Sequence, residues 1–318
     1  MPRFCIVIPS FNNEKTIGEA VETALAQCHD DFAVVVGDNG SKDRSQAIVD
    51  AFDDPRLIKR LNAETLAKTD NWNRAYRDAP DCEYLVTLHG DDRLAPDALA
   101  AIAAEADRGA PPLIHGRFDV IDAEGARLRT VGIPFDYVAS GDEFRRMQIA
   151  ANVVGVAGVS MRADLFHELG GWPSEWTYMQ DVEMWWRLAG YGPIRHTKAI
   201  LGGYRIFDTK INPAFVDEIG RWVQVHIDDF PLDDLARKSG WDGLATYRAL
   251  LESKADFAES MAGLALDDLL GAAGPYRDPA KRQRLYRMAI VARTILSSDR
   301  REGRGPFATT PIAPRRPL

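Results

Sequence analysis

The sequence lacks the features that mark membrane-spanning and disulfide-bonded secreted proteins. No stretch approaches the roughly 20 apolar residues that a transmembrane helix needs, so we expect none. The first apolar run, Phe4 to Ile8, is too short for a secretory signal peptide. The 3 cysteines, at positions 5, 28 and 82, have no metal-binding or redox spacing. We therefore expect a reduced, cytoplasmic protein, for which contact with the inner face of the membrane stays open.

Basic residues are too few for a nucleic-acid-binding protein. The chain has 39 Lys and Arg against 47 Asp and Glu, which gives a formal net charge of −8 at pH 7. Binding to a nucleic-acid backbone requires a basic face, because the phosphates must be neutralised. We therefore expect no nucleic-acid partner.

A glycine-rich phosphate loop is also missing. The loop after the first apolar run, Pro9 to Glu14, contains no glycine and no cluster of positive charge. Dinucleotide-dependent oxidoreductases have a G-x-G-x-x-G turn at this point. Sugar nucleotidyltransferases bind a triphosphate there with a glycine-rich, basic loop. The sequence disfavours both classes of enzyme.

What the chain does contain is a regular alternation of apolar runs and amphipathic segments. Phe4 to Ile8 and Ala33 to Val36 are typical of strands buried on both faces, and each is followed by apolar residues at helical spacing. This order predicts a mostly parallel α/β sheet with right-handed crossovers. Further elements are expected as strands at Leu113–Asp119, Val153–Met161 and Ile194–Ile206 and as helices at Pro96–Ala106 and Asp181–Ala189.

The central strand of this pattern ends in two adjacent carboxylates. Tyr84 to Leu88 is a short apolar run, and Gly90, Asp91 and Asp92 follow it closely. Ligands of open α/β sheets bind at the carboxyl ends of the strands, and paired carboxylates suit Mg²⁺ or Mn²⁺ shared with a diphosphate. Taken alone, the pair is more typical of a polar turn before a helix that Pro96 starts, and only the rest of the chain favours the metal site.

Two further carboxylates occupy comparable positions. Asp38 follows the second strand, and Asp181 lies in the first turn of a predicted helix. Asx residues often cap turns and helices, so a structural role is open for both. For Asp38 we favour a functional role, because it stands at the carboxyl end of a strand in a β-α-β unit.

Five stretches then occur in a consistent order along the first two thirds of the chain: Phe4–Asn12, Val36–Asp43, Asn71–Ala75, Leu88–Asp92 and Gly170–Asp181. Together they resemble the opening strand, nucleotide loop, third helix, metal motif and acceptor loop of family 2 glycosyltransferases. This resemblance implies the GT-A fold. It covers about Phe4 to Asn212 and leaves the rest of the chain uncovered.

The resemblance also implies roles for individual residues. Asp181 would be the general base, and Asp91, with Asp92, would hold Mn²⁺ or Mg²⁺ against the donor diphosphate. Asp38 would accept a hydrogen bond from the nucleobase. The remaining residues expected around the donor are Pro9, Ser10, Asn12, Asn73 and Gly90. A metal clamp on one side of the sugar and a base on the other suit an in-line displacement, which inverts the anomeric centre.

Two positions depart from the family's pattern. His89 stands where the metal motif usually opens with an acid, and it is open as a metal ligand, a neutral partner for the ribose or a histidine satisfied within the sheet. Phe207 stands where many relatives place a metal-binding histidine, and Asp208 follows it as a candidate replacement. Trp172, Trp176 and Tyr178 are expected either to stack on an acceptor sugar or to pack beneath their loop.

The resemblance and the pattern together give one functional hypothesis. We expect a metal-dependent, inverting hexosyl- or glycosyltransferase that uses a nucleotide sugar, UDP-linked by preference, and a saccharide or lipid-linked acceptor in bacterial cell-surface polysaccharide biosynthesis. The alternatives are a catalytically inactive glycosyltransferase-like scaffold and, ranked below it, a sugar nucleotidyltransferase. A homodimer stays open.

The expected domain organisation has three parts. Residues 1–214 form the GT-A domain and residues 215–299 form a helical C-terminal region, because helical periodicity continues without strand patterns. Residues 300–318 are rich in Arg, Pro and Gly and are expected to be a disordered tail.

Overall fold

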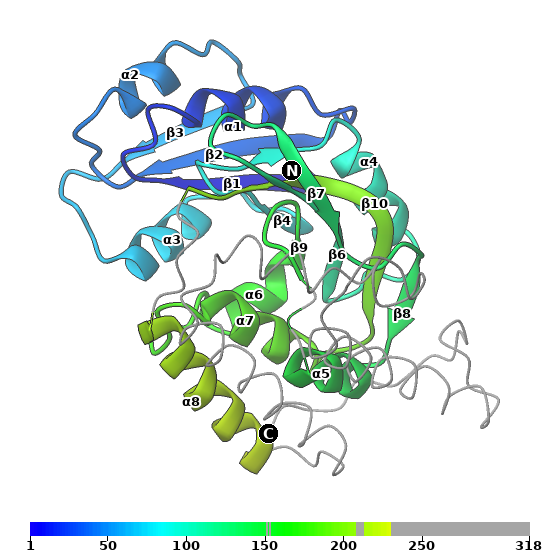
Figure 1. Ribbon diagram of the computed structural model, residues 1–318. Coiled ribbons are helices and arrows are strands. Elements are labelled where there is room, and N and C mark those ends of the chain that lie inside the picture. The colour runs from blue at the N-terminus through cyan, green and yellow to red at the C-terminus, as the bar shows by residue number, and fades with distance from the viewer. Residues whose placement is uncertain (151, 153, 208–212, 230–318) are drawn as a thin grey trace.

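The computed structural model describes residues 1–150, 152, 154–207 and 213–229 (Figure 1). Its strands are β1 (Phe4–Ser10), β2 (Phe32–Asp38), β3 (Leu57–Leu61), β4 (Tyr84–Thr87), β5 (Arg93–Leu94), β6 (Leu113–Ile121), β7 (Arg127–Val131), β8 (Tyr137–Ala139), β9 (Ser160–Arg162) and β10 (Ile194–Arg205). Its helices are α1 (Ile17–Leu25), α2 (Ser45–Asp50), α3 (Lys68–Arg77), α4 (Ala98–Ala106), α5 (Gly141–Ala150), α6 (Ala163–Glu168), α7 (Gln180–Leu188) and α8 (Pro213–Asp229).

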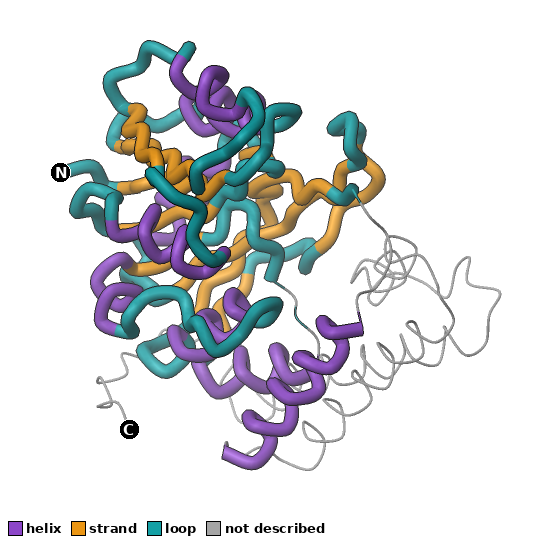
Figure 2. Tube along the Cα trace, turned by 90° about the vertical axis from the view of Figure 1, so that its left-hand side faces the viewer, coloured by secondary structure: helices purple, strands orange, loops and turns teal. Residues whose placement is uncertain are grey.

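The described strands form one sheet with the order β3-β2-β1-β4-β9-β6-β10-β5, in which β7 pairs with β6 and β8 with β10. The first half, β3-β2-β1-β4, is parallel throughout, as the sequence pattern predicts. Helices lie on both sides of the strands in the rotated view (Figure 2). The α/β class is therefore confirmed for the described part of the chain.

Strand β1 explains why its apolar run is unbroken. Cys5 and Val7 point into one hydrophobic core, which also contains Tyr76 of α3. Phe4, Ile6 and Ile8 point into the core on the other face, which includes residues of α1 and α4. A strand covered on both faces has no polar side to show, so its sequence does not alternate.

The second half of the sheet is mixed and corrects one prediction. A strand was expected from Val153 to Met161, but the strand β9 begins only at Ser160 and runs antiparallel to β4 and β6. Gly158 has a φ of 82°, which lies outside the extended conformation. Its N–H donates to Thr87 O at 2.9 Å, so this segment bends against β4 before it joins the sheet.

Helix α8 is the first part of the expected C-terminal helical region. It begins at Pro213, so the proposed boundary at residue 214 falls in its first turn. Val216, Trp222 and Val223 of α8 pack with Trp186 of α7 in a third hydrophobic cluster. Helices α5, α7 and α8 lie together on the side away from α1 and α2 (Figure 1). The expected regions 230–299 and 300–318 lie outside the described residues.

Among the described residues, no helix combines the length and the apolar character needed to cross a membrane.

Candidate active site

The carboxyl ends of β1, β2 and β4 bring three predicted loops together. Ser10 lies opposite Asp38 in the parallel register of β1 and β2. Gly90 N–H donates to Pro9 O at 3.3 Å. A Cβ atom on Gly90 would lie 2.9 Å from Asn13 Oδ1, so only glycine allows the two loops to approach this closely. The sheet edge therefore gathers Pro9, Ser10, Asp38 and Gly90 as the sequence predicted.

Asp38 is nearly buried and organises its own loop. Its Oδ1 accepts hydrogen bonds from Ser41 N at 2.8 Å and Gln46 Nε2 at 3.1 Å, and its Oδ2 accepts one from Ser41 Oγ at 2.6 Å. A carboxylate has about four acceptor positions, so these contacts leave one for a further donor. Asn12, with a φ of 54°, is tied to the same loop because its N–H donates to Ser41 Oγ at 2.8 Å.

Asn73 is predicted to lie around the donor, and in the structure its side-chain amide bonds to the backbone of Trp172. Its Oδ1 accepts from Trp172 N at 2.7 Å, and its Nδ2 donates to Trp172 O at 2.9 Å. Both ends of the amide therefore hold the backbone of one residue in the segment Gly170–Asp181. A Cβ atom on Gly171 would lie 2.5 Å from Asn73 Oδ1, which accounts for the glycine there.

The metal motif forms a compact set of possible ligands. His89, Asp91 and Asp92 each offer one ligand atom, and these atoms lie within 4.8 Å of one another. Asp92 is 1% exposed, and its Oδ1 accepts from Arg205 N at 2.8 Å. Its Oδ2 accepts no hydrogen bond from the described residues and lies 3.9 Å from His89 Nδ1. An unsatisfied buried carboxylate oxygen of this kind is a suitable ligand for a cation.

Electrostatics around this set favour a divalent cation with oxygen and imidazole ligands. Burial lowers the pKa of His89 to about 4, an effect that Asp91 opposes and Lys68 reinforces, so the ring is neutral at pH 7. Burial, followed by the charge of Asp91, raises the pKa of Asp92 well above its usual value. A neutral imidazole beside two carboxylates fits Mn²⁺ and, with water, Mg²⁺. Asp208, the other candidate ligand, lies outside the described residues.

Arg205 anchors the metal loop from behind. Its guanidinium is almost fully buried, and its Nε donates to Asp91 O at 2.8 Å. The same side chain donates to Asp122 O and Ala123 O, each at 3.1 Å, and pairs with Glu19 of α1. The backbone of the motif is thus fixed by the last residue of β10.

Asp181, the predicted base, lies at the start of α7 and is partly exposed. Its Oδ1 accepts from Val182 N at 2.8 Å, so it also caps its own helix. Burial raises its pKa, and the Val182 N–H and Lys68 oppose that rise.

Lys68 is a residue that sequence reasoning missed. Its Nζ lies 4.6 Å from the centre of the Trp72 ring and donates to Thr177 O at 3.3 Å. Crowding by protein atoms lowers its pKa, whereas Asp181, Glu218 and Asp91 raise it. One ammonium group thus lies beside the segment that leads to Asp181 and, through the Trp72 ring, near His89 of the metal motif. Lys68 opens α3 without any motif of its own, so the sequence carried no signal for it.

The three aromatic residues near Asp181 have different environments. Trp172 is 2% exposed and Trp176 is 6% exposed, so both pack beneath the loop. Tyr178 is 37% exposed and has its ring centre 5.9 Å from that of Phe215. Of these three aromatic side chains, Tyr178 alone is accessible for stacking.

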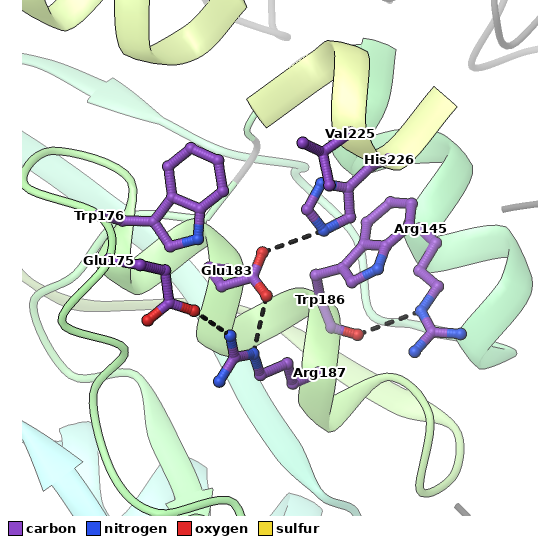
Figure 3. Close-up of a pocket in the computed structure, with 8 residues that line it drawn as sticks. All are labelled: Arg145, Glu175, Trp176, Glu183, Trp186, Arg187, Val225 and His226. Carbon is purple, nitrogen blue, oxygen red and sulfur yellow. Dashed lines mark hydrogen bonds and ion pairs between the residues drawn. The ribbon is translucent and has the colours of Figure 1, made fainter. Parts of the chain in front are cut away.

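The far side of α7 contains a pocket of about 520 Å³ between α5, α7 and α8 (Figure 3). Glu183 lies at its centre, where its Oε1 accepts from Arg187 Nε at 2.7 Å and its Oε2 pairs with His226 Nε2 at 3.0 Å. Arg187 also pairs with Glu175 at the rim. The pocket's charged groups are therefore largely engaged with one another.

Comparison with known families and sequences identifies the family to which the chain is similar. Residues 5–167 match the family described as "Glycosyl transferase family 2". An "Uncharacterized glycosyltransferase" of Rickettsia felis is 24% identical over 203 residues, which are 63% of this chain and 33% of that protein. The "Succinoglycan biosynthesis protein ExoO" of Rhizobium meliloti is 30% identical over 129 residues, which are 41% and 37% of the two chains. The chain thus spans only about a third of the length of these relatives.

Solved structures support the GT-A fold that the sequence predicts. The chain resembles Staphylococcus aureus TarS 1-349, crystallised in complex with UDP-GlcNAc, with a TM-score of 0.61 and 15% identity. The likeness covers 95% of this chain and 92% of that one.

Proposed function

The chain belongs to glycosyl transferase family 2, and on that premise we propose that it transfers a sugar from a nucleoside-diphosphate sugar to a saccharide or lipid-linked acceptor. The observation that carries the proposal is the placement of Lys68, whose ammonium donates to Thr177 O, four residues before Asp181, and lies 4.6 Å from the centre of the Trp72 ring. The Trp72 ring is in turn 4.7 Å, centre to centre, from the ring of His89 in the metal motif. The two groups that such a transfer needs, a diphosphate-binding motif and a base, therefore belong to one site.

The proposed donor is UDP-linked. Asp38 keeps one acceptor position for a base N–H, and Phe11, 44% exposed, stands on the loop next to Ser10. The complex of TarS with UDP-GlcNAc supports uracil as the base and shows that this fold accommodates such a donor. The relation to a succinoglycan biosynthesis protein supports a role in polysaccharide assembly.

The proposed mechanism assigns a task to each group of this chain. Asp181 accepts the proton of the acceptor hydroxyl as that oxygen attacks the anomeric carbon, and the bond to the diphosphate breaks on the opposite face, with inversion. His89, Asp91 and Asp92 would hold Mn²⁺ or Mg²⁺, which when bound neutralises charge on the departing diphosphate. The ammonium of Lys68 adds positive charge between the two sites.

Calorimetric titration of UDP, GDP and dTDP, each with Mn²⁺ and then with chelator, tests the donor site. We expect one nucleotide to bind in the presence of Mn²⁺ and to lose affinity in Asp91→Ala by at least about 100-fold, or about 3 kcal/mol. Asp97→Ala is the matched control, because Asp97 is an exposed carboxylate of the same segment. Folded protein that binds none of the three nucleotides would contradict the proposal. It would favour an inactive scaffold, the alternative suggested by Phe207 and His89, which depart from the family's pattern at the metal site.

A further inference from the structure

The segment before α7 has backbone donors that its own side chains do not satisfy. The first N–H groups of a helix have no partner within that helix and need an acceptor from elsewhere. Met179 occupies the N-cap position of α7 and makes no capping hydrogen bond through its side chain. Ser, Thr, Asp and Asn are the residues that usually supply this acceptor. For the N–H of Met179 and of the two residues before it, the acceptor comes from another part of the chain.

Glu218 of α8 supplies it. Its Oε1 accepts hydrogen bonds from the N–H groups of three consecutive residues, Thr177 at 2.8 Å, Tyr178 at 2.6 Å and Met179 at 3.0 Å. Successive N–H groups that converge in this way form an anion-binding concavity, and bonds to a carboxylate are stronger than bonds to a neutral acceptor. Asp181 is only two residues beyond Met179, so this clamp fixes the backbone that carries it.

Helix α8 is itself held firmly enough to act as a support. Trp222, one turn after Glu218, donates from Nε1 to Glu183 Oε2 of α7 at 2.9 Å. His226, one turn later again, pairs with the same oxygen at 3.0 Å, as Figure 3 shows. Arg221 donates to Glu175 O at 3.0 Å and lies 4.5 Å from the centre of the Trp176 ring. The face of α8 that carries Glu218 is thus docked along α7.

The same segment is also tied on its opposite side. Lys68 Nζ donates to Thr177 O, and Gln180 Nε2 donates to Thr69 Oγ1 at the start of α3. The stretch from Thr177 to Gln180 is therefore held between α3, which lies within the residues 5–167 that match the family, and α8, which lies beyond them.

We propose that Glu218 is the positioning residue of the base, and that α8 thereby forms part of the catalytic machinery. The proposal rests on the proposed function, because it takes Asp181 as the base. Glu218 touches no reacting atom in this scheme; it acts by holding residues 177–179. A displacement of about 1 Å at a reacting group can lower a rate about 100-fold, so loss of the clamp affects turnover more than donor binding.

The test compares Glu218→Ala, Glu218→Gln and Asp217→Ala in the full chain. Gln keeps an amide oxygen that accepts the three N–H bonds, and Asp217 is an exposed carboxylate at the adjacent position of α8. Three readouts are needed: hydrogen exchange of the amides of residues 177–179, Kd for UDP with Mn²⁺, and release of UDP from UDP-GlcNAc with kcat and KM separated. Thermal unfolding reports the folded fraction of each variant.

For Glu218→Ala we expect faster exchange at residues 177–179, kcat lower by about 10- to 100-fold, and KM and Kd within about 2-fold of the parent. Glu218→Gln should recover kcat to within about 5-fold, and Asp217→Ala should match the parent. Unchanged exchange or unchanged kcat in Glu218→Ala overturns the inference, as does a kcat loss that Gln does not rescue. A parent protein that neither binds UDP nor releases it overturns the proposed function, an outcome that the parent alone reveals.

Discussion

The proposed site has two halves, the donor edge (Pro9, Ser10, Asp38, Gly90 and the metal motif) and the base segment (Thr177–Asp181). They place their carboxylates by different means. Asp38 is fixed by Ser41 and Gln46, three and eight residues away, on a loop set by the register of two parallel strands. The segment before Asp181 is fixed by Glu218, about 40 residues later, and by Lys68, 109 residues before Thr177. The loop of Asp38 is built from local turns, and the segment before Asp181 is held by contacts between distant elements.

This difference predicts that substitutions will separate the two halves of the reaction. Changes on the donor edge should alter nucleotide binding, because that edge presents the metal motif and the base-binding loop. Changes around α7 should alter turnover, because the contacts with Lys68, Thr69 and Glu218 hold the segment that carries Asp181.

The largest expected effect is that of Asp181→Asn. Loss of a general base typically lowers a rate by about 10²- to 10⁴-fold, and Asn keeps an oxygen for the Val182 N–H, so the helix should remain capped. We expect UDP binding to be unchanged while UDP release from the sugar donor falls within this range, as measured by steady-state kinetics. Equal losses in binding and turnover would erase the distinction between the two regions.

Glu183→Gln tests the support of α7 through stability and pH. Its hydrogen bonds and charge pairing with His226 and Arg187 outweigh its burial and lower the pKa of Glu183 from 4.5 to about 2. Because the folded-state pKa is depressed, the ionised Glu183 stabilises the folded protein. Its contribution to the free energy of unfolding is complete above pH 4.5 and is lost as pH falls toward 2. It amounts to about 3 kcal/mol at pH 7 and about half of that near pH 3.

Urea unfolding of the parent and Glu183→Gln at pH 7 and pH 3 measures this contribution. The difference in unfolding free energy should be largest at pH 7. Glu175→Gln is the control, since Glu175 is the exposed carboxylate of the same pocket and a surface pair contributes about 0–1 kcal/mol. A difference that grows as pH falls would contradict the assigned pairing.

Asn73→Ala and Asn12→Ala sharpen the comparison from its two sides. Loss of the two hydrogen bonds from Asn73 to Trp172 should destabilise the protein by about 2 kcal/mol and lower turnover, with UDP affinity retained. Asn12→Ala should instead weaken UDP binding, because Asn12 Oδ1 accepts from Lys42 N at 2.9 Å and so helps to hold the loop that follows Asp38. Calorimetric titration of both variants with UDP measures these affinities. A loss of UDP affinity in Asn73→Ala would mean that Asn73 contributes to the donor edge.

The smallest effect is expected at Gly170, which opens the acceptor loop. Its φ is 84°, and an added Cβ would meet no atom within 4 Å. Gly170→Ala should therefore cost only the backbone strain of a left-handed residue, about 1–2 kcal/mol, measured as a shift in thermal unfolding. A larger loss would mean that the loop has contacts beyond those that the clamp of Glu218 explains.

The sequence predicted which loops meet at this edge of the sheet, because each motif there directly follows a buried strand. The positions of Pro9, Asp38 and Gly90 at one sheet edge needed only the β-α-β order. It could not distinguish Asp91 from Asp92, since their different burial depends on Arg205 of β10. The sequence also could not identify Glu218. The spacing of apolar residues along α8 predicts a helix, but it does not predict which groups a polar side chain of that helix contacts elsewhere.

The contacts of Arg205 have a consequence for the order in which the protein is assembled during synthesis. Strands β1, β2 and β3 pair with one another across 28 residues (Phe4 and Phe32) and 23 residues (Val34 and Leu57) of chain and can form early. The carbonyl of Asp91, however, finds its guanidinium partner 114 residues later, at the end of β10. Contacts between distant residues form late, because the intervening chain must be ordered first. A nascent chain is therefore expected to complete its sheet core well before its metal loop, and the donor site matures only when nearly the whole fold is in place.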